Sequence, residues 1–323
     1  MRTKTMAVYF MLFIMCTTLV WLTGCHETRI DLAKKTQISD GEFFAQINDL
    51  KLWYKVSGTG PVCILPTPGW GPSSELYYIK LAPLEEMFTM VYLDTRGSGR
   101  SQRPELNEYT MSHFVSDIEG LRNHLGVKTM WLMGHSDGGP MILNYAFKYE
   151  NHVQGLIMVD APIGDSSKGN DRMKRMQLRK DELWFDTAFK GFTQMATTQE
   201  EFEAHNQTIM PFFFSSIENL EKNHEVFEKI SLSFHASQGR GPSEQLSTDL
   251  AAFMSVMEIP TLIIVGVDDF ICPPSVAQYL HQEIPNSKLL VIEHTGHFPW
   301  MEEPDQFFGG MSTFLPKLGY HKN

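Results

Sequence analysis

The sequence has 323 residues, 42% hydrophobic and 20% charged, with 24 glycines and 17 prolines, which excludes a mainly disordered or collagen-like chain. The formal net charge is −11 and the one dense basic stretch is 172–180, so nucleic acid is excluded as a partner. Four cysteines are too few for a disulfide scaffold, and the length suits one large domain or a domain with a sizeable insertion.

The N-terminal segment has the pattern of a targeting signal. A positively charged start precedes an uncharged apolar run over 6–22, as in a bacterial secretory signal. The run stops in Leu-Thr-Gly-Cys, which ends at Cys25 and resembles the lipobox of bacterial lipoproteins. This resemblance implies that 1–24 is a lipoprotein signal peptide, that Cys25 carries the lipid, and that 25–40 is a short polar tether.

A lipid on Cys25 determines the expected location of the chain. Two alkyl chains hold a protein durably on a lipid bilayer. The following residue is His26 rather than aspartate, which in lipoproteins of diderm bacteria implies the outer membrane. We therefore expect a lipid-anchored protein of the bacterial cell envelope, on the outer membrane and facing the periplasm. An uncleaved membrane anchor and simple secretion are the alternatives.

From about residue 41 onward, strand patterns alternate with helix patterns. Two strand-like segments separated by two residues, 43–48 and 51–56, predict an opening hairpin. The next predicted strands are 62–65, 90–93, 129–133 and 153–159, and the predicted helices are 73–87, 112–125 and 141–149. Apolar strands that alternate with helices predict an α/β fold with a mostly parallel sheet covered on both faces.

The alternation stops after residue 162. Residues 163–257 carry helical patterns without a convincing strand. Strands over 261–265 and 288–292 and a closing helix over 305–318 then resume the α/β pattern. The predicted organisation is a core over 41–162 and 258–323 that is interrupted by a helical insertion over 163–257.

The sequence Gly-His-Ser-Asp-Gly over 134–138 stands between a predicted strand and a predicted helix. This is G-x-S-x-G in the strand–turn–helix context that a nucleophilic serine needs. The sharp turn places Ser136 in strained geometry at the positive end of a helix. Gly134 and Gly138 are expected to be needed because strand and helix pack closely there, and His135 is expected to pack beside the turn.

A serine hydroxyl needs a base that is held by an acid. The strand over 261–265 is followed by Asp268 and Asp269, and the next strand is followed by His294 and His297. All these groups stand at the carboxyl ends of parallel strands, where open α/β sheets place their sites. The order serine, acid, histidine predicts a catalytic triad.

Together these features resemble the α/β-hydrolase superfamily, from about residue 50 to the C-terminus. The segment Leu-Asp-Thr-Arg-Gly-Ser-Gly-Arg-Ser over 93–101 is similar to the proline iminopeptidase-like branch of that superfamily. The resemblance implies an α/β-hydrolase fold, with a mostly parallel central sheet flanked by helices. It also implies that the insertion is a helical cap.

The resemblance further implies roles for single residues. Ser136 matches the nucleophile, and His297 matches the base because the family histidine follows a glycine in this loop. Asp269 matches the acid. Asp268 and, after the preceding strand, Asp160 are the rivals for the acid.

The resemblance also implies an oxyanion hole of two backbone N–H groups. The first is that of Asp137, the residue after the nucleophile. Relatives carry a His-Gly-rich loop after the first parallel strand, whereas this chain reads Pro-Thr-Pro-Gly-Trp-Gly over 66–71. Pro68 has no N–H to donate. The second donor is therefore Gly69 or Trp70, and we favour Trp70.

The remaining chemistry-bearing side chains give a weaker signal. His294 is a rival for the base. His294 and His297 together could suggest a metal site, but no carboxylate stands at a suitable ligand spacing, so we predict no metal and no cofactor. Cys63 is expected to be a core residue, with a disulfide to Cys272 as the alternative.

The cap decides the substrate, and its sequence leaves the choice open. Its aromatic residues either wall an apolar pocket or bind the cap helices to the core: Trp184, Phe185, Phe192, Phe212, Phe213 and Phe214. No acidic residue of the cap stands out as the ligand for the free ammonium of an aminopeptidase substrate.

The predicted function is that of a serine hydrolase. It cleaves an ester or amide bond of a small molecule or short peptide through an acyl-enzyme. One alternative is a proline iminopeptidase-like aminopeptidase, and another is a lactonase or a cofactor-free haloperoxidase-like enzyme. A non-catalytic binding protein on the same fold is the alternative from another class.

Overall fold

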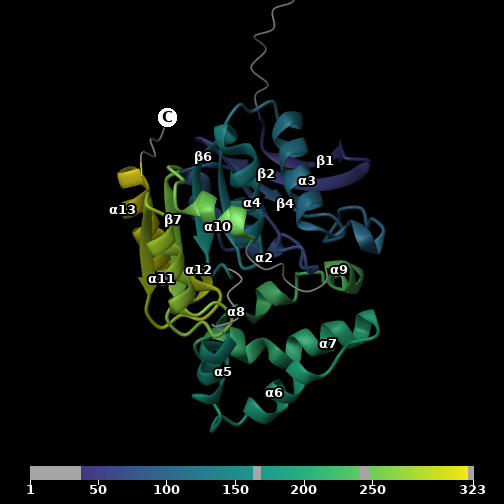
Figure 1. Cartoon of the computed structure of the whole chain (residues 1–323). Helices are drawn as coiled ribbons and strands as arrows, with labels where there is room; N and C mark the ends of the chain where they lie inside the picture. Colours follow the sequence, from purple (N-terminus) through teal and green to yellow (C-terminus); the bar gives the residue numbers. More distant parts are fainter. Residues whose placement is uncertain (1–37, 163–168, 241–246, 319–323) are drawn as a thin grey trace, which may run out of the picture. The chain divides into compact units, whose positions relative to one another are not determined.

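The computed structural model describes residues 38–162, 169–240 and 247–318 (Figure 1). The predicted signal peptide, the lipidation site Cys25 and the tether as far as residue 37 lie outside these ranges. Within the described ranges, no helix has both the length and the apolar character needed to cross a membrane.

The described residues contain one eight-stranded sheet in the order β1-β2-β4-β3-β5-β6-β7-β8. The strands are β1 Gly41–Ile47, β2 Leu50–Gly58, β3 Val62–Pro66, β4 Thr89–Leu93, β5 Met130–His135, β6 Val153–Val159, β7 Thr261–Gly266 and β8 Ser287–Ile292. β2 pairs antiparallel with both β1 and β4, and the other neighbouring pairs are parallel. The predicted mostly parallel sheet is therefore confirmed.

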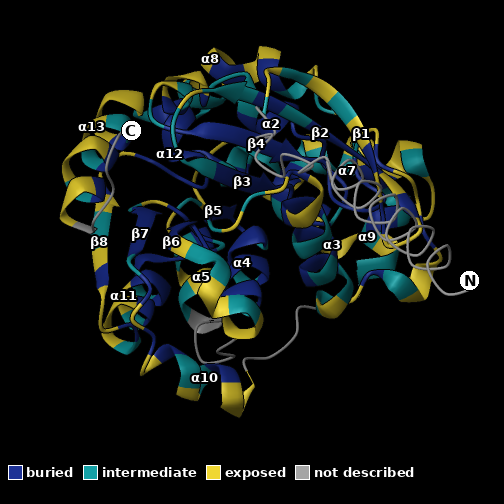
Figure 2. Cartoon of the chain, turned by 90° about the horizontal axis from the view of Figure 1, so that it is seen from above, coloured by how far each residue is buried: buried dark blue, intermediate teal, exposed yellow. Residues whose placement is uncertain are grey.

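Helices cover both faces of this sheet (Figure 2). They are α2 Glu75–Tyr78, α3 Met111–His124, α4 Gly138–Tyr149, α11 Pro274–Glu283, α12 Pro299–Glu302 and α13 Pro304–Phe314. α3, α4 and α11 pack into one apolar cluster, and α2, α12 and α13 pack into another. Within β5, Leu132 belongs to the first cluster whereas Trp131 and Met133 belong to the second, because alternate strand residues face opposite sides. The predicted α/β class is confirmed.

The helix predicted over 73–87 is wrong. The structure has the short α2 and a separate 3₁₀ turn over Ala82–Glu86. Pro83 stands at the start of that turn, and a proline both lacks an N–H and disfavours helical geometry in the residue before it. The apolar spacing on either side of Pro83 concealed the break. α11 was not predicted.

Between β6 and β7 the described residues form helices and no strand. These helices are α5 Gly169–Gln177, α6 Phe185–Thr193, α7 Gln199–Ile209, α8 Ile217–Phe227, α9 Phe234–Arg240 and α10 Thr248–Met254. Figure 1 shows α5, α6 and α7 together beyond the ends of the strands. α10 falls within the range predicted as cap, yet its Leu250 and Met254 belong to the same apolar cluster as Ile142 of α4. Ala236 of α9 belongs to that cluster too, but Phe234 of α9 also packs on Phe202 of α7, with ring centroids 5.7 Å apart. We therefore use the word cap for α5 to α9.

Candidate active site

The turn between β5 and α4 carries Ser136 at the carboxyl end of its strand. Ser136 has a φ of 52°, in the left-handed region that residues other than glycine rarely adopt. Its N–H donates to the Val159 carbonyl at 3.0 Å, and its own carbonyl accepts the Gly139 N–H at 2.8 Å. These bonds hold the strained turn, which is a common property of functional sites.

Two glycines beside Ser136 are required by packing. A Cβ at Gly134 would lie 2.4 Å from the Gly138 carbonyl oxygen, which agrees with the expected close approach of strand and helix. A Cβ at Gly138 would meet only the Pro66 carbonyl oxygen at 3.5 Å, so the expectation for Gly138 is wrong. The second tight position is Gly139, where a Cβ would lie 2.3 Å from the Ala161 side chain.

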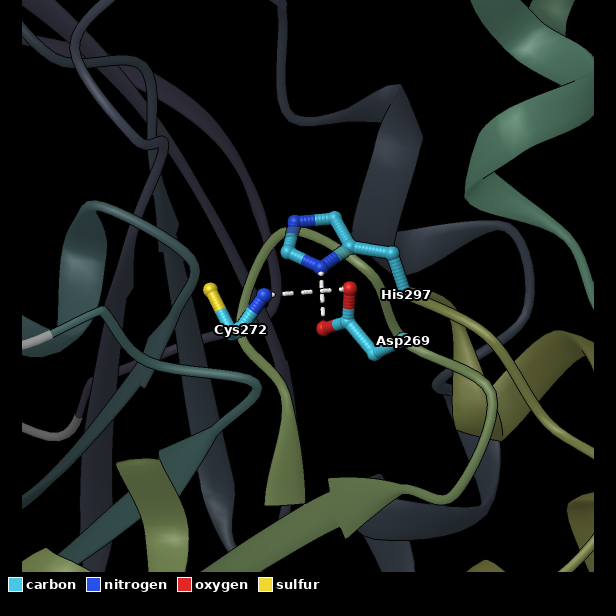
Figure 3. Close-up of side chains that lie close together, drawn as sticks. All are labelled: Asp269, Cys272 and His297. Carbon is cyan, nitrogen blue, oxygen red and sulfur yellow. Dashed lines mark hydrogen bonds and ion pairs between the residues drawn. The ribbon is translucent and has the colours of Figure 1, made fainter. Parts of the chain in front are cut away.

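Asp269 and His297 form a buried pair at the neighbouring strand ends (Figure 3). His297 Nδ1 lies 2.8 Å from Asp269 Oδ2. The other carboxylate oxygen accepts the N–H groups of Ile271 at 2.8 Å and Cys272 at 3.2 Å. Burial by itself would raise the pKa of Asp269, but the His297 ring and these donors outweigh it and lower that pKa below its ordinary value. The carboxylate is thus ionised and oriented on the ring.

The rivals for the acid and the base differ from Asp269 and His297 in their surroundings. Asp268 and His294 are exposed, and the Asp268 N–H donates to the Thr295 carbonyl at 2.8 Å. Asp160 is buried, and its Oδ1 accepts the Gly266 N–H at 2.9 Å. Burial and the neighbouring Asp269 raise the pKa of Asp160 well above its ordinary value. The shift of this pKa favours the protonated form of Asp160.

The loop that carries His297 is fastened to the cap. The His297 N–H donates to the Phe213 carbonyl at 2.7 Å. The preceding Gly296 N–H donates to Glu302 Oε1 at 2.7 Å, and Glu302 Oε2 accepts the N–H and hydroxyl of Ser215 at 2.8 and 2.7 Å. The sequence analysis missed Glu302, whose position directly after the apolar run 298–301 is the local feature that could have drawn attention to it.

His135 packs beside His297. The two ring centroids are 4.6 Å apart, and His135 Nε2 lies 2.9 Å from the His297 carbonyl oxygen. Burial, with the charge of His297 as a smaller cause, lowers the pKa of His135 well below its ordinary value. The neutral form of the His135 ring is thus favoured, and the ring packs against that of His297.

A cavity of about 550 Å³ lies between the core and the cap. Ser136, His297 and Asp137 line it from the core. The charged residues that line it from the cap are Arg172 on α5, Glu203 on α7, Glu228 directly after α8, and Arg240 at the end of α9. The space is thus apolar in part, with several charged groups around the predicted nucleophile.

The aromatic side chains of the cap mostly pack on one another. Phe212 contacts Trp184, Phe185 and Phe192, with centroid distances of 4.8 to 5.5 Å. Of the six aromatic residues named in the sequence analysis, only Phe213 lines the cavity. The alternative that they bind the cap helices to the core fits three of the other five, because Phe192 and Phe212 pack on Phe270 after β7 and Phe214 packs on Phe298 after β8.

The predicted oxyanion donors are Asp137, directly after Ser136, and Trp70 or Gly69 in the loop after β3. Asp137 is the N-cap residue of α4, and Trp70 lines the cavity. Gly69 is not among the lining residues; it has a φ of 77°, and a Cβ there would lie 2.6 Å from the end of the Met141 side chain. The choice between Trp70 and Gly69 as the second donor stays a prediction.

Cys272 brings a thiol close to the Asp269–His297 pair (Figure 3). The potential ligand atoms of Asp269, Cys272 and His297 lie within 4.8 Å of one another. However, Asp269 and His297 are bonded to each other, and burial raises the pKa of the Cys272 thiol well above its ordinary value. A protonated thiol is a poor metal ligand. Cys63 and Cys272 are both buried and free, so the disulfide alternative is wrong.

Comparisons with known proteins identify relatives of this chain. Residues 61–304 match the family model described as alpha/beta hydrolase fold. The chain is 28% identical over 302 residues to a proline iminopeptidase from Thermoplasma volcanium, covering 88% of this chain and 99% of that protein. A proline iminopeptidase from Saccharolobus solfataricus is 27% identical over 308 residues, with 88% and 95% covered.

Solved structures share the fold. A thermophilic esterase from Thermogutta terrifontis superposes with a TM-score of 0.65 at 25% identity, covering 86% of this chain and 99% of the esterase. The family match contains the Ser136 turn, the Asp269–His297 pair and the whole cap. The chain therefore belongs to the α/β-hydrolase fold family and is a hydrolase of that fold.

Proposed function

We propose that this hydrolase is a serine enzyme that cleaves an ester or amide bond of a small substrate. Ser136, His297 and Asp269 act as its triad. The main support is the 2.8 Å contact between the buried Asp269 and His297, whose ring lines the same cavity as Ser136. A carboxylate in that position fixes the orientation of the imidazole and stabilises its protonated form.

The proposed reaction proceeds through an acyl-enzyme. Ser136 Oγ attacks the substrate carbonyl carbon while its proton passes to His297 Nε2, because Nδ1–H is held by Asp269. The negative oxygen of the tetrahedral intermediate accepts the N–H of Asp137 and the N–H of Trp70 or Gly69. The imidazolium then gives its proton to the leaving alcohol or amine. A water molecule then attacks the acyl carbon while its proton passes to His297. The carboxylic acid leaves and His297 returns the proton to Ser136 Oγ.

A covalent serine probe tests the nucleophile. A fluorophosphonate should label the wild type, and Ser136→Ala should remove the label while the melting temperature stays within about 2 °C. Ser255→Ala, which changes an exposed serine on the core, is the matched control and should label as strongly as the wild type. Undiminished labelling of Ser136→Ala would show that another residue is the nucleophile.

Aminopeptidase activity is a second candidate, which the acidic residues of the cavity favour. Glu203 and Glu228 both line it from the cap, and carboxylates bind a free ammonium by charge-assisted hydrogen bonds. The relatives named proline iminopeptidases add support. The lactonase and haloperoxidase-like alternatives use the same triad, and no contact in the cavity favours them over an ester or amide.

A comparison of substrates distinguishes the aminopeptidase from the other candidate activities. If the cavity accepts a free ammonium, Glu203→Gln combined with Glu228→Gln should raise KM for an aminoacyl p-nitroanilide about tenfold or more. The same variant should hydrolyse p-nitrophenyl acetate with a KM within about threefold of the wild type. An equal rise in KM for both substrates would contradict recognition of the ammonium. Lactones and acyl esters in the same screen test for lactonase and esterase activity.

The location of the chain is a separate proposal. The support is the pattern of the N-terminal sequence, in which the apolar run over 6–22 is followed closely by Cys25. We expect a lipid on Cys25 to hold the hydrolase on the outer membrane, facing the periplasm. Cells that express the wild type should incorporate labelled palmitate into it, and Cys25→Ser should abolish the incorporation. Labelling of Cys25→Ser would contradict the lipobox assignment.

A further inference from the structure

An ion pair across the cavity joins the residue after Ser136 to the cap. Asp137 lines the cavity, and its side chain is 16% exposed. Arg240, the last residue of α9, places its Nη2 2.5 Å from Asp137 Oδ1. The proposed mechanism uses the backbone of Asp137 and neither of these side chains.

The helix that carries Arg240 is anchored on the core. The Ser233 N–H, directly before α9, donates to the Gly71 carbonyl at 3.0 Å. The Tyr109 hydroxyl lies 2.9 Å from His235 Nδ1, and a Cβ at Gly239 would lie 2.1 Å from the Tyr109 ring. Gly71 belongs to the loop that is predicted to supply the second oxyanion donor. The segment 233–240 therefore contacts the Gly71 loop through Ser233 and the residue after Ser136 through Arg240.

A bare carboxylate beside Ser136 would oppose the proposed chemistry. The tetrahedral intermediate is negatively charged and needs the N–H of Asp137 and the positive end of α4. Asp137 is the N-cap residue of α4, and its side chain makes no capping hydrogen bond. Its charge would therefore weaken the positive field at the helix end, and charges a few ångströms apart interact strongly in a partly dry cavity.

We infer that Arg240 is a positioning residue for the hydrolysis. It neutralises the Asp137 carboxylate and holds it on the cap side of the cavity. The Asp137 N–H and the N-terminus of α4 then remain available to the intermediate. The inference rests on the proposed serine mechanism, and it gives the cap a part in the reaction besides substrate binding.

Other charged or titratable groups also face Asp137. They are Arg172 on α5, His297 after β8, Tyr77 on α2 and Cys272 after β7. Burial raises the pKa of Asp137, and Arg240 is the strongest of the cations that oppose this rise. Without Arg240 the carboxyl group therefore holds its proton to a higher pH.

A double-mutant cycle on the full chain tests the inference. On a p-nitrophenyl ester at pH 8, Arg240→Met should lower kcat about 10- to 100-fold with KM changed less than threefold, and Arg240→Lys should recover most of the loss. In an Asp137→Asn background, the same Arg240→Met change should cost less than about threefold. An equal loss in both backgrounds would overturn the inference, because it would show a purely structural role for Arg240.

The pH profile adds a readout that packing alone would not move. The ratio of kcat in Arg240→Met to kcat in the wild type should rise toward one as the pH falls, because protonated Asp137 no longer opposes the oxyanion; a ratio independent of pH would overturn the inference. Lys190→Met, which removes an exposed cation from α6, is the matched control and should stay within twofold of the wild type. If a fluorophosphonate does not label the wild type, the serine mechanism itself is refuted. Labelled wild type with fully active Arg240→Met would refute the role of Arg240 alone.

Discussion

The carboxyl ends of β6 and β7 each carry a buried aspartate, and the two ends differ in what surrounds the carboxyl group. Asp160 after β6 is 1% exposed and accepts one backbone N–H, whereas Asp269 after β7 is 0% exposed and accepts two backbone N–H groups and the His297 ring. The pKa of Asp160 is raised and that of Asp269 is lowered. Nearly equal burial thus goes with opposite pKa shifts, because the number of donors and the nearby imidazole decide which form is favoured.

The largest expected effect is at the β7 end. Asp269→Asn should lower kcat on an ester substrate about 10³- to 10⁴-fold, because an amide neither fixes the His297 tautomer nor stabilises the imidazolium. Asp268→Asn is the matched control, since Asp268 is the exposed neighbour, and its kcat should stay within about threefold of the wild type. Steady-state kinetics check both variants. Equal losses at the two positions would remove Asp269 from its proposed role.

A smaller effect is expected where the His297 loop meets the cap. Glu302→Gln should lower kcat about tenfold, because the amide has one acceptor oxygen in place of two, so its NH2 group must face either the Gly296 N–H or the Ser215 N–H. The loss should fall on kcat more than on KM, since Glu302 is not among the cavity-lining residues. Glu303→Gln, at the next and less buried position, provides the control. A change in KM alone would show that the link serves substrate binding.

The smallest expected effect on activity is at the β6 end. Asp160→Asn should keep kcat within about threefold, because the amide still accepts the Gly266 N–H and offers a donor toward Asp269. A loss comparable to that of Asp269→Asn would show that Asp160 is the acid.

The same variant tests stability. Asp160 binds a proton when the chain folds. The free-energy cost of this proton uptake to folding grows as the pH rises from the ordinary aspartate pKa toward the raised pKa of the folded state. Asp160→Asn should therefore raise the melting temperature by about 2 °C or more at pH 8 and much less at pH 4. Asp269 affects stability with the opposite sign. Its stabilising contribution to the free energy of unfolding is complete above the ordinary aspartate pKa and is lost as the pH falls and the carboxylate of the folded state is protonated. A melting temperature that falls in Asp160→Asn at pH 8 would contradict the raised pKa of Asp160.

The core could be predicted from the sequence because its signals are local. The apolar strands, the G-x-S-x-G turn and the aspartate and histidine after successive strands each fall within a few residues, and the parallel topology brings them to one edge. The contacts between core and cap escaped prediction because they join distant positions: Glu302 and Ser215 are 87 positions apart. Arg240 and Asp137 likewise lie in separate parts of the chain, and no periodicity relates them.

The hydrogen bond from the His297 N–H to the Phe213 carbonyl has a consequence for protein engineering. Grafting the cap of a relative onto this core, in order to transplant its selectivity, would remove a carbonyl on which the imidazole loop rests. A chimaera should therefore keep residues 213–215, together with Glu302, as part of the recipient. Exchanging only the helices outside that short segment would alter the choice of substrate while leaving the reaction machinery of the host intact.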